Sequence, residues 1–147
     1  MIEGKVLVTG SNGQLGKCLQ EITSWQVYKN KFLFTTREEF DITNVEMMKN
    51  YLETHRDIKY LINCAAYTNV KEAQTEEGAK QAMLINCDAV KNVAELCKEY
   101  DIFLIHFGTD YMYKDGYTGM VKFFDENEIQ YNYRDDFFFK YYGGLSN

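Results

Sequence analysis

The sequence predicts an α/β protein whose parallel sheet is doubly wound, with helices on both faces. Two observations predict this class. Short runs that are apolar on both faces recur along the chain, as is typical of buried parallel strands. Segments with apolar residues at helical spacing alternate with these runs, as expected for a sheet covered by helices. The 147 residues and the 46% hydrophobic share suffice for one domain with a sizeable core.

Four β-branched or aromatic runs are the predicted strands, and a fifth, shorter strand is expected between the second and third of them. By residue number the predicted strands are 5–9, 32–35, 40–42, 60–66 and 102–107. The repeated change from strand to helix without a Gly/Ser linker indicates a single sheet and no second domain boundary within it.

Three helices are predicted. The first follows a glycine-rich turn and has an apolar face made of Leu15, Cys18, Leu19 and Ile22. Thr43 and Glu46 match a capping box that begins the second helix. Asp88 is the expected N-cap of the third, whose apolar face is Val90, Val93, Ala94 and Cys97.

Composition excludes several classes of function. The net charge is −6 and no Lys/Arg cluster is present, so nucleic acid is not an expected partner. No apolar run approaches the length of a membrane span, and the N-terminus has no signal-peptide pattern; we therefore expect a cytoplasmic protein that binds no membrane. The four cysteines and two histidines lack metal-ligand spacing, so no metal site is predicted.

The turn after the first strand has the pattern G-x-x-G-x-x-G, formed by Gly10, Gly13 and Gly16. The first glycine permits a tight turn, the second lets a pyrophosphate approach the backbone, and the third lets the helix pack closely on the strand. The start of the following helix offers free N–H groups to phosphate. Because a strand precedes this turn and an amphipathic helix follows it, a dinucleotide site is predicted.

The end of the second strand is where such folds contact the adenosine ribose. Arg37 stands about 20 residues after the last glycine, and a guanidinium suits a 2′-phosphate, which favours NADPH over NADH. The alternative is a solvated surface arginine, because Glu38 and Glu39 follow it and can pair with it or take the place of the acid that reads NADH.

Five motifs follow one another along the chain: VLVTGSNGQLG, TREEFDIT, LINCAAYTNV, INCDAVKNVAELC and HFGTDYMYKDG. In order and spacing they resemble the dTDP-4-dehydrorhamnose reductases of the short-chain dehydrogenase superfamily, and the resemblance covers residues 2 to about 117. It implies a Rossmann-like sheet that binds NADPH, or NADH, and the reduction of the C4 carbonyl of a nucleotide-linked 4-keto-6-deoxy sugar in dTDP-rhamnose biosynthesis.

The resemblance also assigns site residues. It implies a pyrophosphate loop made of Gly10, Asn12, Gly13, Gln14 and Leu15, closed by Gly16. By the same motifs Asp41 and Ile42 contact adenine, and Ala65, Ala66 and Tyr67 line the ribose side. Thr109 matches the threonine that hydrogen-bonds the reacting carbonyl; its alternative role is a strand-end hydroxyl that satisfies backbone.

The proton donor expected from the resemblance is incomplete. A tyrosine hydroxyl must protonate the carbonyl oxygen, helped by a lysine four residues later. Tyr133 lies at the family's distance beyond Thr109, but Phe137 occupies the lysine position. The one Tyr-x-x-x-Lys in the chain, Tyr67 with Lys71, falls inside the cofactor motif.

Three interpretations follow, and they leave open whether the chain is an enzyme. In the first, residues 1–117 are the NAD(P)-binding domain of a nucleotide-sugar reductase, residues 118–147 are a divergent aromatic-rich tail, and the substrate domain is absent. Within that tail, the aromatic run at residues 131–142 has neither a helical nor a strand period and is expected to be irregular. In the second, the chain is a non-catalytic NADP-binding or regulatory protein, similar to the β subunit of methionine adenosyltransferase. In the third it is a truncated product. A homodimer, or a partner chain that completes the site, is compatible with each.

Overall fold

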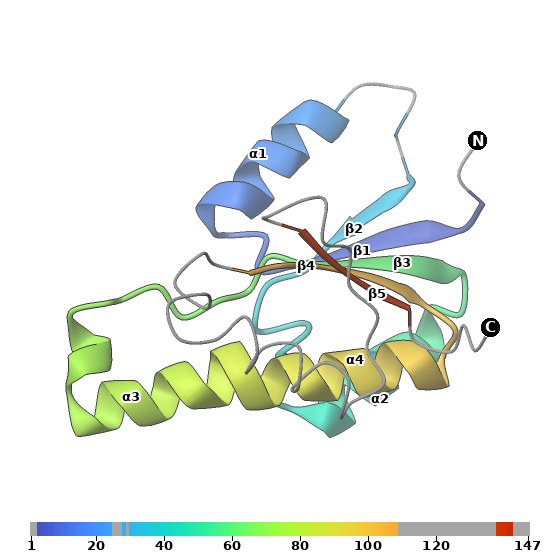
Figure 1. Cartoon of the computed structure of the whole chain (residues 1–147). Helices are drawn as coiled ribbons and strands as arrows, with labels where there is room; N and C mark the ends of the chain where they lie inside the picture. The colour runs from blue at the N-terminus through green and yellow to red at the C-terminus, as the bar shows by residue number, and fades with distance from the viewer. Residues whose placement is uncertain (1–2, 25–27, 29, 109–137, 143–147) are drawn as a thin grey trace.

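A computed structural model of the chain describes residues 3–24, 28 and 30–108, and the backbone of residues 138–142 (Figure 1). These residues form a sheet with helices on both sides. In chain order the elements are β1 (Lys5–Thr9), α1 (Gln14–Thr23), β2 (Phe32–Phe34), α2 (Val45–Thr54), β3 (Ile58–Asn63), the 3-10 turn η2 (Glu72–Gln74), α3 (Glu76–Met83), the π-helical turn η3 (Leu84–Asp88), α4 (Ala89–Glu99), β4 (Phe103–Phe107) and β5 (Phe138–Tyr142).

The sheet has the strand order β2-β1-β3-β4-β5. The first four strands are parallel, and β5 is antiparallel to β4. After β1 the chain adds β2 at one edge of β1, and after β2 it crosses back to add β3 at the other edge of β1. The direction in which strands are added therefore reverses between β1 and β3. In open α/β sheets ligands bind beyond the carboxyl ends of the strands at such a reversal. The predicted doubly wound α/β class is confirmed.

The face of the sheet that contacts α2 and α4 is the centre of the core. Leu7, Leu61 and Leu104 lie side by side in register on β1, β3 and β4, and each is 0% exposed. They share one apolar cluster with residues of both helices, Met48, Leu52, Val93 and Cys97. The expected apolar face of the third helix is confirmed, since Val90, Val93, Ala94 and Cys97 are all buried.

The opposite face is less completely covered by the described residues. Figure 1 shows α1 on this side and α2 and α4 on the other. Val6 and Val8 of β1 are buried here, but Tyr60 and Ile62, their neighbours on β3, are half-buried. Along β4 the same position in the sheet is taken by Phe103 and Ile105, which are also half-buried.

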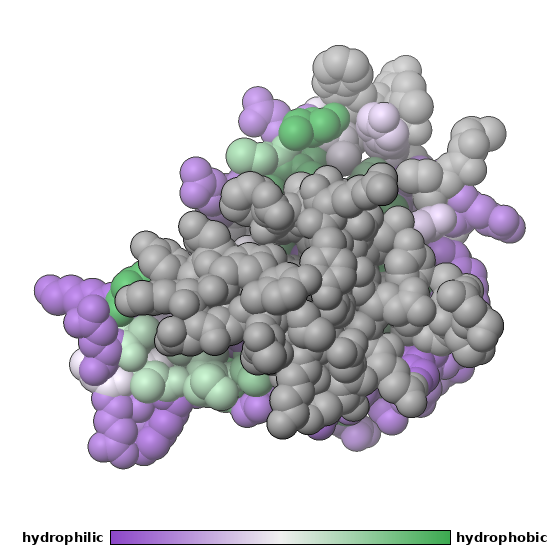
Figure 2. Space-filling model, in the orientation of Figure 1, coloured by the Kyte–Doolittle hydropathy of each residue, from purple (hydrophilic) through white to green (hydrophobic). Residues whose placement is uncertain are grey.

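Helix α1 forms where it was predicted, but most of its expected apolar face is not buried. Leu15 and Cys18 are exposed, Ile22 is 64% exposed, and Leu19 is half-buried. Gly16 is the buried residue of this helix. Figure 2 shows apolar side chains at the surface over α1. The position of α1 therefore depends on close backbone contact at Gly16 more than on side-chain burial.

One predicted strand was wrong, and one strand was missed. Residues 40–42 form no strand: the chain turns at Thr36, whose carbonyl accepts from the Phe40 N–H at 2.9 Å, and Phe40 and Ile42 fill the core from this turn. Residues 138–142, expected to be irregular because their aromatic run has no clear period, form β5. The partner strand β4 decides this, because pairing supplies the regularity that periodicity lacks.

Two predicted helix starts also shift. The N-cap of α2 is Asn44, whose side chain accepts from the Met47 N–H, while the Thr43 hydroxyl donates to Asp41. Asp88 caps nothing, because it lies inside a helical run that begins after Thr75 and continues through α3, η3 and α4. Thr75 is the N-cap here, accepting from the Gly78 N–H at 3.0 Å.

Within the described ranges, no helix is both long and apolar enough to span a bilayer. The same residues contain no group of three or more His, Cys, Asp or Glu side chains that could hold a metal ion.

Candidate functional site

A pocket of about 260 Å³ opens at the carboxyl ends of β1 and β3, where the strand order reverses. It brings together three segments that are far apart in the sequence: the glycine turn, the turn after β2, and the loop after β3. Of the predicted cofactor residues, those that line it are Gly10, Gly13, Arg37, Asp41, Ile42, Ala65 and Ala66.

Other predicted residues lie beside the pocket or outside the described chain. Asn12, Gln14 and Leu15 are exposed in and after the glycine turn, Gly16 is buried beneath it, and the Tyr67 side chain is not part of the lining. The two predicted catalytic residues, Thr109 and Tyr133, both fall outside the described residues.

Four lining residues were not predicted: Phe40, Thr43, Cys64 and Ile85. The first three flank predicted site residues, so the same motifs contained the signal for them. Ile85 follows β3 by more than twenty residues and reaches the pocket from the π-turn η3. It begins the motif INCDAVKNVAELC, to which no site residue was assigned.

The glycine turn brings β1, α1 and the loop after β3 into close contact. A Cβ at Gly10 would lie 2.6 Å from the Ala65 nitrogen, and the backbone there has a φ of +63°, which L side chains rarely adopt. A Cβ at Gly16 would lie 2.5 Å from the Ser11 Cα. Gly13, as the N-cap, has no side chain to satisfy the first N–H groups of α1. The helix therefore presents unsatisfied donors at the pocket, a favourable position for an anion.

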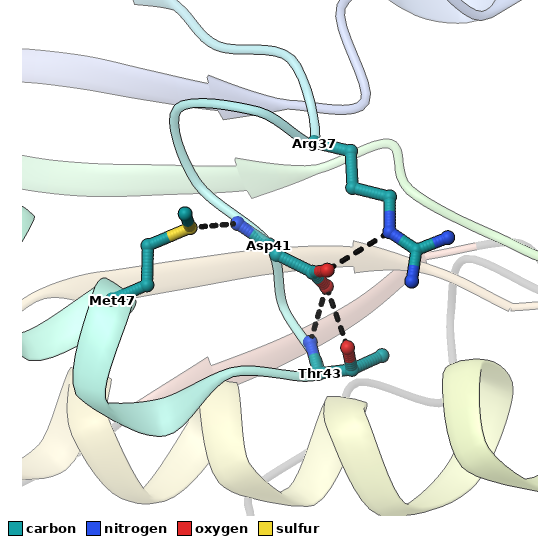
Figure 3. A network of polar contacts seen from close by, with 4 residues as sticks. All are labelled: Arg37, Asp41, Thr43 and Met47. Atoms are coloured by element: carbon teal, nitrogen blue, oxygen red, sulfur yellow. Dashed lines mark hydrogen bonds and ion pairs between the residues drawn. The ribbon is translucent and has the colours of Figure 1, made fainter.

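The turn after β2 holds Arg37 against Asp41 (Figure 3). The Arg37 Nε donates to Asp41 Oδ2 at 2.8 Å, and Asp41 Oδ1 accepts from the N–H and hydroxyl of Thr43 at 2.9 and 2.7 Å. The Asp41 N–H contacts the Met47 sulfur at 3.3 Å. Arg37 pairs with neither Glu38 nor Glu39 in these contacts, and Glu39 instead accepts from the Thr36 N–H.

This pairing leaves a cationic group at the pocket rim. Partial burial alone would raise the pKa of Asp41, but the hydrogen bonds from Arg37 and Thr43 and the Arg37 charge hold it below its usual value. Asp41 is 18% exposed and Arg37 is 73% exposed. Figure 3 draws the contact with Asp41 at the Nε, and no contact among the four labelled residues uses the two terminal amino groups of the guanidinium.

A row of polar side chains lies behind the pocket, two residues after the leucine row of the core in each strand. Thr9, Asn63 and His106 are in register at the ends of β1, β3 and β4. Asn63 Oδ1 accepts from the Thr9 hydroxyl at 2.7 Å and from the Ala65 N–H at 3.2 Å, and Asn63 Nδ2 donates to His106 Nδ1 at 3.1 Å. Burial lowers the pKa of His106 to about 4, so the ring is neutral at pH 7.

Comparison with known proteins identifies the family. The family model described as RmlD substrate binding domain matches residues 4–133, farther than the motif resemblance that ends near residue 117. The chain is 32% identical over 113 residues to a dTDP-4-dehydrorhamnose reductase of Aggregatibacter actinomycetemcomitans, covering 77% of this chain and 37% of that protein. The chain belongs to the dTDP-4-dehydrorhamnose reductase family.

Other relatives agree. The chain is 33% identical over 107 residues to a dTDP-4-keto-6-deoxy-D-glucose reductase of Streptomyces niveus, covering 73% of the chain and 35% of that protein. A crystal structure of dTDP-4-dehydrorhamnose reductase from Bacillus anthracis in complex with NADP matches at a TM-score of 0.60 and 32% identity, covering 71% of this chain and 35% of that one. The chain thus spans about a third of the length of these relatives.

Proposed function

We propose that the chain binds NADP(H) through this pocket as the cofactor-binding part of a reductase acting on a nucleotide-linked 4-keto-6-deoxy sugar. One observation carries the proposal: the glycine turn and Arg37, which is hydrogen-bonded to Asp41, line the same pocket, and this pocket lies where the strand order reverses. Bound NADPH supplies a hydride to a carbonyl. The pocket's own residues bind and orient the dinucleotide.

The residues present suit a dinucleotide. At Gly10 and Gly16 a side chain would fill the space where the turn contacts its neighbours, and at Gly13 the first N–H groups of α1 remain available for pyrophosphate. Phe40, Ile42 and Ala66 give the pocket apolar walls that fit an adenine ring. Ligand pockets usually measure about 300–1,000 Å³, so this one suits the adenosine end of a dinucleotide rather than the whole.

Arg37 favours the phosphorylated cofactor. The Arg37 Nε–H donates to Asp41, so this carboxylate sets the direction of the guanidinium. Asp41 offsets the positive charge of Arg37 only in part. The remaining donors match a 2′-phosphate. For an NADH-selective site we would expect a free carboxylate to accept from the ribose hydroxyls, and Asp41 is engaged by Arg37 and Thr43 instead.

Reduction of the sugar needs groups beyond this pocket. Tyr133 stands at the family position of the proton-donating tyrosine, but the residue four places later is Phe137 and not lysine. We therefore propose nucleotide binding, without turnover, for these residues taken alone. General acid help contributes about 10² to 10⁴ to a rate, so its loss would leave little activity.

The test is a calorimetric titration of the chain with NADPH and with NADH. We expect saturable binding that is tighter for NADPH. Arg37→Ala should weaken NADPH binding about tenfold and leave NADH binding nearly unchanged, since a charge-assisted bond to phosphate contributes about 1.5–3 kcal/mol. Arg56→Ala is the matched control, because Arg56 pairs with Glu53 and does not line the pocket. Absence of binding to the folded chain would contradict the proposal.

A further inference from the structure

Ser11 belongs to the glycine turn, but its side chain bonds to a neighbouring strand end and does not line the pocket. Ser11 is 3% exposed. Its hydroxyl donates to the Thr35 carbonyl at 2.9 Å, and its N–H donates to the same oxygen at 3.1 Å. Thr35 directly follows β2 and is 1% exposed. One buried carbonyl therefore ties the glycine turn to the end of β2 through two hydrogen bonds.

Both residues of this link are held from their other sides as well. The Thr35 N–H and hydroxyl donate to the Val8 carbonyl of β1 at 2.9 and 3.1 Å. The Gln20 Nε2 of α1 donates to the Ser11 carbonyl at 2.8 Å, and a Cβ at Gly16 would lie 2.5 Å from the Ser11 Cα. The Ser11 hydroxyl is therefore a side-chain bond that joins two segments, each of which is fixed to the sheet or to α1.

The link lies close to Arg37 in the sequence. The chain reaches Arg37 two residues after Thr35, on the turn that Figure 3 shows with Asp41. Gly13 and Arg37 both line the pocket. In the proposed function the start of α1 binds the pyrophosphate and Arg37 binds the 2′-phosphate of one ligand. Both contacts form together only when the two segments keep a fixed relative position, and a preformed arrangement lowers the cost of binding.

We propose that Ser11 is a positioning residue for cofactor selectivity: its hydroxyl holds the end of β2, and with it Arg37, where a 2′-phosphorylated dinucleotide on the glycine turn requires the guanidinium. This inference rests on the proposed function. Loss of the hydroxyl leaves no buried acceptor empty, because the Thr35 carbonyl keeps the Ser11 N–H. The fold should therefore tolerate Ser11→Ala, and the effect should fall on NADPH binding.

The experiment compares Ser11→Ala with Ser24→Ala in the full chain. Ser24 is the matched control, because its hydroxyl also donates to a backbone carbonyl, that of Glu21 at 2.7 Å, and it lies at the far end of α1 outside the pocket lining. For Ser11→Ala we expect the Kd for NADPH to rise about fivefold and the Kd for NADH to change by less than about twofold. For Ser24→Ala we expect both Kd values within about twofold of wild type.

A double-mutant cycle with Arg37→Ala separates the positioning role from a merely structural one. If Ser11 acts through Arg37, adding Ser11→Ala to Arg37→Ala should raise the Kd for NADPH further by less than about twofold. A further fivefold rise would overturn the role, as would equal losses for NADPH and NADH or an unchanged Kd for NADPH in Ser11→Ala.

One measurement needs no nucleotide. The Arg37 Nε–H signal in the NMR spectrum reports the bond to Asp41, and it should move in Ser11→Ala and stay in place in Ser24→Ala. An unmoved signal in Ser11→Ala would overturn the link between Ser11 and Arg37. Failure of the wild type to bind either nucleotide would contradict the proposed function instead, and the Nε–H signal would still decide whether Ser11 holds Arg37.

Discussion

On the side of the sheet that packs against α2 and α4, Leu7, Leu61 and Leu104 are fully buried, whereas on the α1 side Tyr60 and Ile62 are half-buried. The two faces also differ at their carboxyl ends. The α4 side continues from its leucine row into the hydrogen-bonded row Thr9, Asn63 and His106, which fixes the pocket wall at Ala65. The α1 side contributes backbone, through the glycine turn. Substitutions can therefore distinguish the leucine row, which stabilises the fold, from the polar row and the glycine turn, which shape the pocket.

The largest difference is expected between matched substitutions of neighbouring residues on β3. Leu61→Ala leaves a cavity in the core cluster and should lower the free energy of unfolding by about 3 kcal/mol. Ile62→Ala, on the half-buried face, should cost about 1 kcal/mol. Urea denaturation of both variants measures this. Equal losses would mean that the α1 face is as well packed as the other.

The polar row predicts a pH dependence on the α4 side. An unfolded histidine takes up a proton near pH 6.5, but the buried His106 does so only near pH 4. Stability from this group is therefore fully present above pH 6.5 and is lost as the pH falls toward 4, by up to about 3 kcal/mol. Urea denaturation between pH 7 and 4 should show this slope in wild type and a flatter one in His106→Gln. The same slope in both proteins would assign the loss to other groups.

Within the glycine turn, Gly13 gives the smallest effect on stability and the clearest separation of fold from site. Gly10→Ala should cost about 2 kcal/mol, because of both the positive φ and the contact with Ala65. Gly13→Ala should change stability by less than about 0.5 kcal/mol, since its Cβ would meet only the Gly10 carbonyl at 3.2 Å, yet it should weaken NADPH binding because Gly13 lines the pocket. Thermal unfolding and a nucleotide titration measure the two quantities. A destabilised Gly13→Ala would show that fold and site are not separable here.

The sequence predicted those parts of the molecule that local chemistry determines. The strand at Lys5–Thr9, the helix after the glycine turn and the family follow from short motifs. Burial of α1 could not be predicted from its spacing, because periodicity shows which residues share a face and not whether another element covers that face. The strand β5 was missed because its regularity comes from pairing with β4.

The site shows the same division. Residues next to the glycine pattern and next to strand ends were found, since parallel strands bring their carboxyl ends together. Ile85 was missed because the motif INCDAVKNVAELC, which begins with it, predicted only a helix, and the sequence does not show that the π-turn brings this residue to the pocket. The partner of Arg37 was also not predicted: the sequence placed Glu38 and Glu39 beside it, and the turn folds so that Asp41 reaches the guanidinium instead.

The most direct test of the central claim is an amide-resolved NMR titration of the 147-residue chain with NADPH. The account predicts saturable shifts that cluster at the glycine turn, at Arg37 to Thr43, and at Ala65 and Ala66, with the β3 and β4 amides of the leucine row nearly unmoved. Saturable shifts that cluster elsewhere on the folded chain, or none at millimolar NADPH, would contradict it.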